Sequence, residues 1–185
     1  MNFVGAGGPF YKPGESIPGS TAVVTQFIEF NDFFLQIRER RGAYGAFATL
    51  DKWTGLLVFM SYRDPNLGET LEVYESVPSY LVEAMQDSAT AIPLINSDII
   101  GTIGSLDGAA PQPNTAGWIS LLRWLSGSTP KMRQKWRDDI LATNNNDFLE
   151  YAKRFDSWSP TLAITGPKAL LQKEKRLNLT LIDEL

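Results

Sequence analysis

The sequence predicts an α+β fold, in which helices pack on one face of a small, mainly antiparallel sheet. Three observations lead to this prediction. Two neighbouring runs, 44–50 and 56–62, are rich in apolar and aromatic residues and read as strands. Apolar residues recur at helical spacing through most of the middle of the chain, while further strand-like runs lie near both ends. Strands at both ends of a helical middle favour a layer of helices against one sheet.

The first sixty or so residues predict a strand, a helix and a hairpin. Residues 1–18 are rich in glycine and proline, which favours a short strand followed by a loop. From Ser20, a possible N-cap together with Thr21, apolar residues at helical spacing predict a buried helix. Its apolar stripe comprises Val23, Val24, Phe27, Ile28, Phe30, Phe34, Leu35 and Ile37. The two strand-like runs then flank Asp51–Gly55, which is typical of a hairpin turn.

The remainder of the chain predicts five helices and a closing strand. Asp64 and Pro65 are typical of an N-cap followed by proline at the first helical position, and we expect this helix to bend at Pro78. Further helices with an apolar face are expected near 97–106, 115–125, 129–142 and 146–156. Residues 161–165 predict a short strand, and the charged tail predicts a helical turn and an edge strand at 177–182.

Size and composition predict a single folded domain over residues 1–185, with 1–18 as its lead-in. An apolar content of 43% and five tryptophans supply enough hydrophobic surface for a core. The formal charge of −4 is small and spread along the chain, so we expect no nucleic-acid partner. No stretch is long and apolar enough to span a membrane, and no targeting segment is visible at the N-terminus.

The chain contains no histidine and no cysteine. This composition excludes the usual nitrogen and sulfur ligands of catalytic zinc, as well as catalytic triads and cysteine–histidine dyads. The aspartates and glutamates of the chain would suffice for chemistry that needs only carboxylates, but no local pattern supports it. Asn144–Asp147 lacks the spaced ligands of a calcium loop and is typical of a helix start. We therefore expect the isolated chain to be neither an enzyme nor a holder of a metal or other cofactor.

Two features have both a structural and a functional interpretation. Basic residues alternate at 131, 133, 135 and 137, which favours a solvated helix face and leaves an acidic partner or nucleic acid as the minority interpretation. Trp53 lies at the tip of the expected hairpin, where a large aromatic side chain has little to pack against within its own domain. Trp53 is therefore a candidate contact with another subunit.

Three blocks of the sequence resemble one protein family, in the family's order and at similar spacing. The first is Ile37–Gly45 (IRERRGAYG), which runs from the end of the expected helix through a glycine turn into a strand. The second is Ser61–Leu67 (SYRDPNL), and the third is Ile99–Asp107 (IIGTIGSLD) with a helical stretch at 118–125 after it. Together they resemble the C-terminal domain of presequence proteases and falcilysin, in the pitrilysin/insulinase clan of metallopeptidases, over nearly the whole chain.

The resemblance implies a substrate-binding role for two residues. In this family two halves enclose a chamber, the zinc helix lies in the N-terminal domain, and the last domain contributes an arginine and a tyrosine that hold the substrate. The matching positions here are Arg38 and Tyr44. A guanidinium can donate to a peptide carbonyl or carboxylate, and a phenol can donate to the oxyanion formed when zinc-bound water attacks. Any zinc would then be bound by a partner half.

Alternative interpretations of these residues stay open. Arg38 could belong to a cationic helix end that complements the helix dipole, and Tyr44 could be a half-buried strand residue. Arg40 and Arg41 occupy positions where the family commonly has small or uncharged residues. They are therefore candidate contacts with a partner protein, and they also leave the chamber chemistry open to question.

The resemblance leaves two functions. One is a non-catalytic domain that serves as a structural or substrate-chamber subunit of a larger organellar assembly, in the mitochondrial matrix or a plastid. The alternative is the C-terminal part of an active split or truncated zinc metallopeptidase that degrades targeting peptides, with Arg38 and Tyr44 holding the substrate. The expected partners are other protein subunits or an N-terminal peptidase half, and the expected ligands are unstructured peptides.

Overall fold

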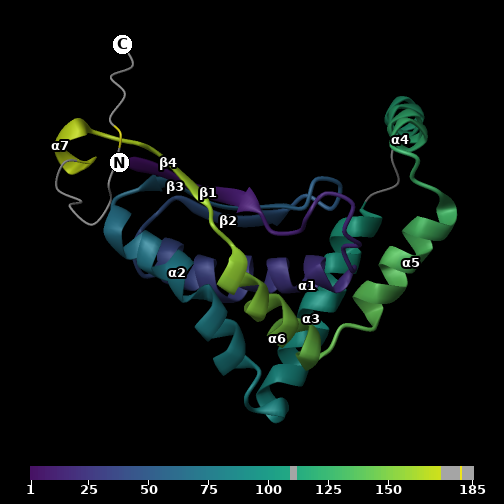
Figure 1. Ribbon diagram of the computed structural model, residues 1–185, viewed down its shortest axis with the longest axis horizontal. Helices are drawn as coiled ribbons and strands as arrows, with labels where there is room; N and C mark the ends of the chain where they lie inside the picture. The colour runs from purple at the N-terminus through teal and green to yellow at the C-terminus, as the bar shows by residue number, and fades with distance from the viewer. Residues whose placement is uncertain (109–111, 172–179, 181–185) are drawn as a thin grey trace.

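The structure is a computed structural model that describes residues 1–108, 112–171 and 180. Its centre is an antiparallel sheet with the strand order β2–β3–β1–β4. The four strands are β1 (Asn2–Pro9), β2 (Gly45–Leu50), β3 (Leu56–Asp64) and β4 (Thr161–Thr165). Helices cover one face of this sheet, as Figure 1 shows, which confirms the predicted α+β class.

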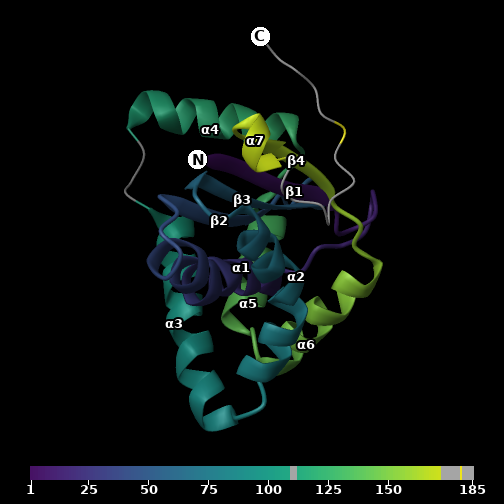
Figure 2. The ribbon, with the colours of Figure 1, turned by 90° about the vertical axis from the view of Figure 1, so that its left-hand side faces the viewer.

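The helical layer is formed by segments from the middle of the chain. The helices of the described residues are α1 (Ser20–Phe27), α2 (Leu67–Ala84), α3 (Ser88–Asp107), α4 (Pro113–Leu125), α5 (Pro130–Leu141), α6 (Asn145–Arg154) and the short α7 (Lys168–Leu171), of which α4 and α7 lie outside the layer. A π-helix, η1 (Ile28–Glu39), continues α1, and a 3₁₀ turn, η2 (Phe155–Ser157), continues α6. The views of Figures 1 and 2 place α1, α2 and α6 on one side of the strands.

The opposite face of the sheet carries exposed apolar side chains. Phe3, Phe47 and Met60 stay 46%, 43% and 38% exposed, and they come from three neighbouring strands. No described helix lies across the middle of this face in Figure 1. The sheet therefore presents an open apolar surface on the side away from the core.

The core lies between the sheet and the helices and is rich in aromatic rings. Phe33 of η1 meets Phe59 of β3 with ring centroids 4.9 Å apart, in an edge-to-face arrangement. Phe27 of α1 meets Phe148 of α6 in the same way at 5.1 Å. All four side chains are fully buried. The first contact fixes η1 against the sheet and the second fixes α1 against α6, and together they position the residues at the C-terminal end of η1.

The predicted buried helix is present, but its second half, η1, winds as a π-helix. The buried apolar residues of η1 are Ile28, Phe33 and Ile37, which recur at intervals of five and four residues. This wider winding leaves Phe30 56% exposed and Leu35 40% exposed. The α-helical spacing placed both residues on the buried stripe, so that part of the prediction is wrong.

The hairpin of β2 and β3 and the helix after it form where they are predicted, with one shift. The helix expected from Pro65 begins at Leu67. The buried carboxylate of Asp64 accepts hydrogen bonds from the backbone N–H of Asn66 at 2.8 Å and from the hydroxyl of Thr70. Asp64, predicted as the N-cap, therefore stabilises the helix start from two residues before the observed N-cap, Asn66.

The start of α3 is the largest boundary error. This helix begins at Ser88, whereas the sequence predicted a start near residue 97. Asp87 provides the cap, because its side chain accepts from the backbone N–H of Ala89 at 3.0 Å. Both α2 and α3 continue through an internal proline, Pro78 and Pro93 respectively. The bend expected at Pro78 stays a prediction.

The last helices lie near their predicted ranges but are less buried than their apolar faces suggest. None of the residues of α4 is buried, and Trp124 and Leu125 are 77% and 64% exposed. In α5, Ile140 is buried, whereas Met132 of the same helix is 51% exposed. The edge strand expected at 177–182 lies outside the described residues, apart from position 180. Within the described part of the chain, no helix has the length and hydropathy needed to cross a membrane.

Candidate substrate-contact site

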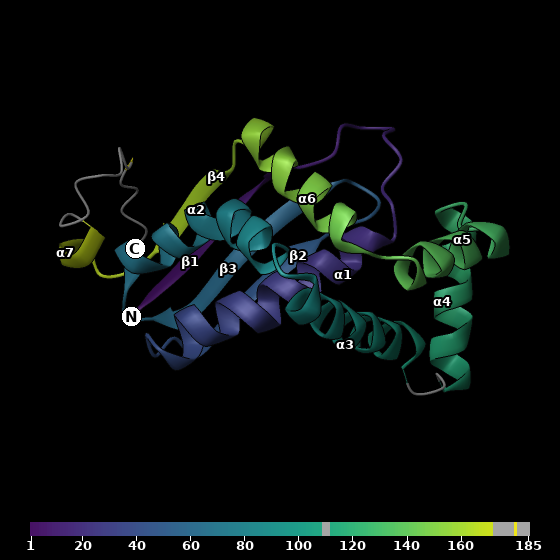
Figure 3. The same cartoon turned by 90° about the horizontal axis from the view of Figure 1, so that it is seen from below.

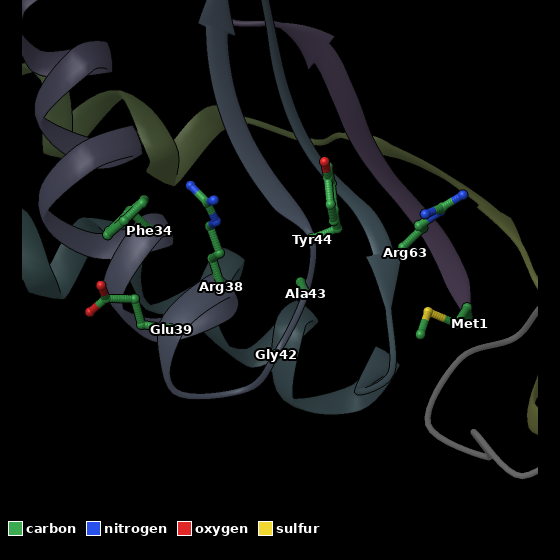
Figure 4. Close-up of a pocket in the computed structure, with 8 residues that line it drawn as sticks. All are labelled: Met1, Phe34, Arg38, Glu39, Gly42, Ala43, Tyr44 and Arg63. Carbon is green, nitrogen blue, oxygen red and sulfur yellow. The ribbon is translucent and has the colours of Figure 1, made fainter.

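Arg38 and Tyr44 line the same pocket, which has a volume of about 470 Å³. Arg38 lies near the end of η1 and Tyr44 immediately precedes β2. Figure 4 shows the two side chains pointing in the same direction above the turn that joins them. Tyr44 is 67% exposed, and Arg38 is exposed as well. The two predicted substrate contacts are thus brought together and are accessible from solvent in this chain.

A glycine turn brings these two residues together. Gly42 has a φ of 78°, which glycine adopts without a steric penalty. The backbone N–H of Gly42 donates to the carbonyl oxygen of Arg38 at 2.9 Å, and that of Ala43 donates to the carbonyl of Ile37 at 3.1 Å. These two bonds end the helix in the manner of a C-terminal glycine cap. The chain can then enter β2 almost at once.

Gly45 has a different role from the one the sequence suggests. Gly45 follows the same turn, but only Gly42 of the two has a positive φ. A Cβ atom at Gly45 would lie 2.8 Å from the ring of Phe47. The missing side chain therefore makes room for the Phe47 ring on the open face of the sheet.

Arg63 also lines the pocket, although the sequence analysis did not assign it to the site. Its guanidinium lies 5.8 Å from the ring centroid of Tyr44 and 5.5 Å from that of Tyr62. Arg63 has a φ of 50°, which is uncommon for a residue other than glycine, and it lies beside the register shift between β1 and β3. No ion pair in the described ranges includes Arg63.

The guanidinium of Arg38 packs on an aromatic ring and faces the pocket. It lies 5.0 Å from the ring centroid of Phe34, one turn earlier in η1. None of the ion pairs formed by described residues involves Arg38. The pocket lining contains two arginines and a single carboxylate, Glu39. This balance of charge suits a carbonyl or carboxylate ligand better than a cationic one.

Arg40 and Arg41 do not line the pocket. Nη1 of Arg40 donates to the side-chain oxygen of Gln36 at 3.1 Å, and Nη1 of Arg41 donates to the main-chain carbonyl of Gln36 at 2.7 Å. The side-chain amide of Asn66 donates to the carbonyl of Arg41 at 2.6 Å, which ties the turn to the start of α2. Both arginines therefore stabilise the end of η1, and their contact with a partner stays a prediction.

A buried carboxylate lies in η1 behind the site. Asp32 is 3% exposed, and burial raises its pKa to about 6, an effect that the positive charge of Arg41 opposes. Its Oδ2 atom accepts no hydrogen bond from any described residue. The hydroxyl of Tyr80 donates to the neighbouring carbonyl of Asn31 at 2.9 Å, which holds this turn against α2. The ionised form of Asp32 is therefore poorly accommodated in the folded chain.

The residues of this chain do not fit a catalytic zinc ion. Such ions are held by histidine, cysteine and carboxylate ligands, most often with at least one histidine. The chain contains neither histidine nor cysteine. Among the described residues, no three acidic side chains gather closely enough to hold a metal. No step through zinc is therefore assigned to residues of this chain.

Trp53, the other candidate partner contact, lies far from this pocket along the sheet. It follows the end of β2, whereas Tyr44 precedes its start. The side chain is 54% exposed, and the ammonium group of Lys52 lies 5.2 Å from its ring. Its exposure is compatible with a partner contact, which stays a prediction.

Comparison with known proteins finds relatives that match most of the chain. A family model described as the PreP C-terminal domain matches residues 1–161. Presequence protease 1, chloroplastic/mitochondrial, from Arabidopsis thaliana is 36% identical over 156 residues, which is 84% of this chain and 14% of the relative. The mitochondrial presequence protease of Emericella nidulans is 31% identical over 155 residues (83% and 14%). Protein HypA from Clostridium perfringens is 31% identical over 153 residues (82% and 15%).

Solved structures share the fold at low sequence identity. A candidate zinc protease from Bordetella pertussis Tohama I has a TM-score of 0.67 and 12% identity, covering 90% of this chain and 94% of that chain. Pitrilysin has a TM-score of 0.54 and 12% identity, covering 88% of this chain and 18% of that chain. These similarities confirm the predicted fold. The chain spans only about 14% of the length of the first two relatives, so it corresponds to one part of much larger proteins.

Proposed function

Because the chain belongs to the family of presequence protease C-terminal domains, we propose that it is the non-catalytic wall of a peptide chamber whose zinc is bound by a separate peptidase half. The observation that carries this proposal is the convergence of Arg38 and Tyr44 on one solvent-accessible pocket. The rings of Tyr44 and Tyr62 lie 5.4 Å apart, and those of Tyr62 and Phe3 lie 5.3 Å apart. The pocket thus adjoins the open apolar face of the sheet.

The chemistry of the pocket is that of binding and charge stabilisation. The guanidinium of Arg38 can hold a peptide carbonyl or a terminal carboxylate through two parallel hydrogen bonds. The phenol of Tyr44 can donate to an oxygen that gains negative charge during peptide hydrolysis. Zinc-activated water would be supplied by the peptidase half when that half is present. The role of this chain is therefore to position the substrate.

The names of the relatives support an organellar location and a peptide substrate. Relatives from a plant and from fungi are presequence proteases described as mitochondrial or chloroplastic. A bacterial relative, HypA, shows that the sequence family is not confined to organelles. The plant and fungal relatives support a mitochondrial or plastid location for this chain, and we propose unstructured targeting peptides as its substrate class.

A purely structural subunit is the second candidate. Its support is the exposed apolar helix α4, which has no buried residue and would be covered in a stable assembly. In that case Arg38 and Tyr44 would be covered by a partner and would hold no peptide. The two candidates differ in whether loss of these side chains affects hydrolysis or assembly.

The test is a reconstitution of the chain with the N-terminal part of a presequence protease. We expect the Arg38→Ala and Tyr44→Phe double variant to reduce kcat/KM for an unstructured peptide by roughly two orders of magnitude, the usual effect of removing an oxyanion donor. Because both side chains are exposed, each change should lower the free energy of unfolding by only about 0.5 kcal/mol. The matched control is Arg40→Ala, which removes an arginine from the same helix end but outside the pocket.

Two results would overturn the chamber role. The first is a double variant that hydrolyses peptide as fast as the unchanged chain at saturating concentrations of the peptidase half. The second is a double variant that no longer binds the peptidase half, while the unchanged complex shows no hydrolysis. The second result would support the structural subunit.

A further inference from the structure

A second cleft, of about 810 Å³, lies at the other end of the sheet from Arg38. It is formed by the tip of the β2–β3 hairpin, the end of α3, and the facing sides of α4 and α5. Figures 1 and 3 show these segments meeting beyond the hairpin end of the sheet. The cleft shares no residue with the Arg38 pocket, so the inference below does not depend on the proposed chamber role.

The lining of this cleft carries unneutralised positive charge. Lys52, Arg123, Arg133 and Arg137 all line it, and Arg137 is paired with Asp107 at 3.0 Å. The ion pairs found in the described ranges include none of the other three cations. Burial and then the charges of Arg123 and Arg133 lower the pKa of Lys52. Three cations thus crowd one cleft of a chain whose net charge is −4.

The cations are held in place by rings and by the backbone. The ammonium group of Lys52 lies 5.2 Å from the ring of Trp53 and 5.1 Å from the ring of Trp136. Nη1 of Arg133 donates to the carbonyl of Ser128 at 2.7 Å. The hairpin tip and α5 therefore form one site, although their sequence patterns suggest two unrelated features.

The apolar part of the surface extends beyond the cleft along α4. Leu122 lines the cleft and is 46% exposed, and Trp118, Trp124 and Leu125 of the same helix are 60%, 77% and 64% exposed. A small anion would neutralise the cations but leave these side chains in water. A partner that offers both carboxylates and apolar side chains would cover both.

We propose that this cleft is the docking site for an acidic segment of a protein partner. Carboxylates of the segment pair with Arg123 and Arg133, while an apolar side chain lies between the indole of Trp53 and the exposed side of α4. Charge complementarity carries the choice of occupant, because unpaired cations beside exposed apolar side chains match a segment that offers both carboxylates and apolar groups. Nucleic acid is disfavoured by the acidic net charge of the whole chain.

The probe is a fluorescein-labelled peptide of about twelve residues that alternates pairs of glutamates with leucines, compared with the same peptide carrying glutamine, at about 0.05 M salt. Fluorescence anisotropy should show that the glutamate peptide binds the full chain at least about tenfold more tightly than the glutamine peptide does.

The Arg123→Glu and Arg133→Glu double variant should lose at least about tenfold in affinity for the glutamate peptide, because charge reversal repels the peptide. The matched control is Lys131→Glu with Lys135→Glu, which changes the net charge equally on α5 but outside the cleft. It should stay within about threefold of the unchanged chain.

Trp53→Ala is a second variant, since the exposed hairpin tip tolerates truncation without unfolding, and it should weaken binding of the glutamate peptide. Circular dichroism checks the fold of each variant. The proposal is overturned if the glutamine peptide binds as tightly, or if the control double variant loses as much affinity as the cleft variant. It is equally overturned if tripolyphosphate or a single-stranded oligonucleotide competes more strongly than the unlabelled glutamate peptide, since the site would then be one for phosphates.

Discussion

At the level of single residues, the buried carboxylate of Asp32 makes the stability of the fold depend on pH. Its pKa is about 6 in the folded chain and close to the ordinary aspartate value of about 4 when unfolded. The folded state therefore binds the proton more strongly than the unfolded state does. This contribution to stability is fully present below about pH 4 and is lost as the pH rises through about 6. At neutral pH the ionised carboxylate thus lowers the free energy of unfolding.

Replacing Asp32 with asparagine should remove this pH dependence. We expect Asp32→Asn to raise the free energy of unfolding at pH 8 by on the order of 1–2 kcal/mol, because no buried charge remains. At pH 4 the gain should largely vanish, because the natural carboxyl group is then neutral in the folded state and about half protonated in the unfolded state. Urea unfolding of both proteins at the two pH values provides the measurement. A variant that is less stable than the natural chain at pH 8 would show that the ionised carboxylate has a favourable partner.

The sequence predicts that Arg38 and Tyr44 lie together better than it predicts their surroundings, and their contact with a substrate stays a prediction. The motif around Gly42 identifies Arg38 and Tyr44, and the turn at this glycine does bring them to one pocket. It does not identify Arg63, whose φ of 50° and position beside a register shift depend on the pairing of β3 with β1. An arginine carries no local signal for such a backbone conformation, so only the sheet reveals it.

At the level of helices, glycines in similar sequence settings differ in how closely other atoms pack against them. Both Gly101 and Gly104 suggest close helix packing. A Cβ at Gly101 would lie 2.2 Å from the side-chain nitrogen of Gln26, which agrees with packing of α3 on α1. A Cβ at Gly104 would meet no described atom within 4 Å, so packing does not explain this glycine. Gly19 has the least room for a side chain beside the backbone, since an added Cβ would lie 2.2 Å from the carbonyl oxygen of Trp136.

Alanine at Gly104 and alanine at Gly19 should therefore change the free energy of unfolding in opposite directions. Gly104→Ala should raise the free energy of unfolding by about 0.5–1 kcal/mol, because alanine is the better helix former and the space is open. Gly19→Ala should lower it by about 1–3 kcal/mol, because α5 would have to move away from α1. Thermal unfolding of the two variants checks both signs. A destabilising Gly104→Ala would contradict the open space that the described residues leave at this position.

The helices also show where sequence periodicity fails. The spacing from Ser20 to Ile37 marks a helix but not the change from α to π winding, which exposes Phe30 and Leu35. The apolar face of α4 predicts a helix at 115–125 but does not say which surface covers it. Both failures have one cause, since local spacing carries no information on the partner that an apolar side chain meets.

At the level of the whole molecule, the open sheet face and α4 should make the isolated chain prone to association. We expect the chain to bind an apolar fluorescent dye and to self-associate at high concentration, because large exposed apolar patches are unfavourable in water. Trp124→Ser with Leu125→Ser should reduce dye fluorescence while changing the free energy of unfolding by no more than about 0.5 kcal/mol, since neither side chain is buried. Dye titration with analytical ultracentrifugation tests this. A monomer that binds no dye would contradict the claim that these exposed apolar surfaces drive association.

The most direct test of the proposed chamber role is to measure bound zinc and peptide hydrolysis in this chain, in the N-terminal peptidase half, and in their mixture. We predict that elemental analysis finds about one zinc per peptidase half and none bound stoichiometrically by this chain, because it lacks histidine and cysteine. Hydrolysis of an unstructured peptide should appear only in the mixture and should be abolished by a chelator. Chelator-sensitive hydrolysis by this chain alone would contradict the proposed chamber role. A peptidase half that reaches full activity without this chain would contradict it as well.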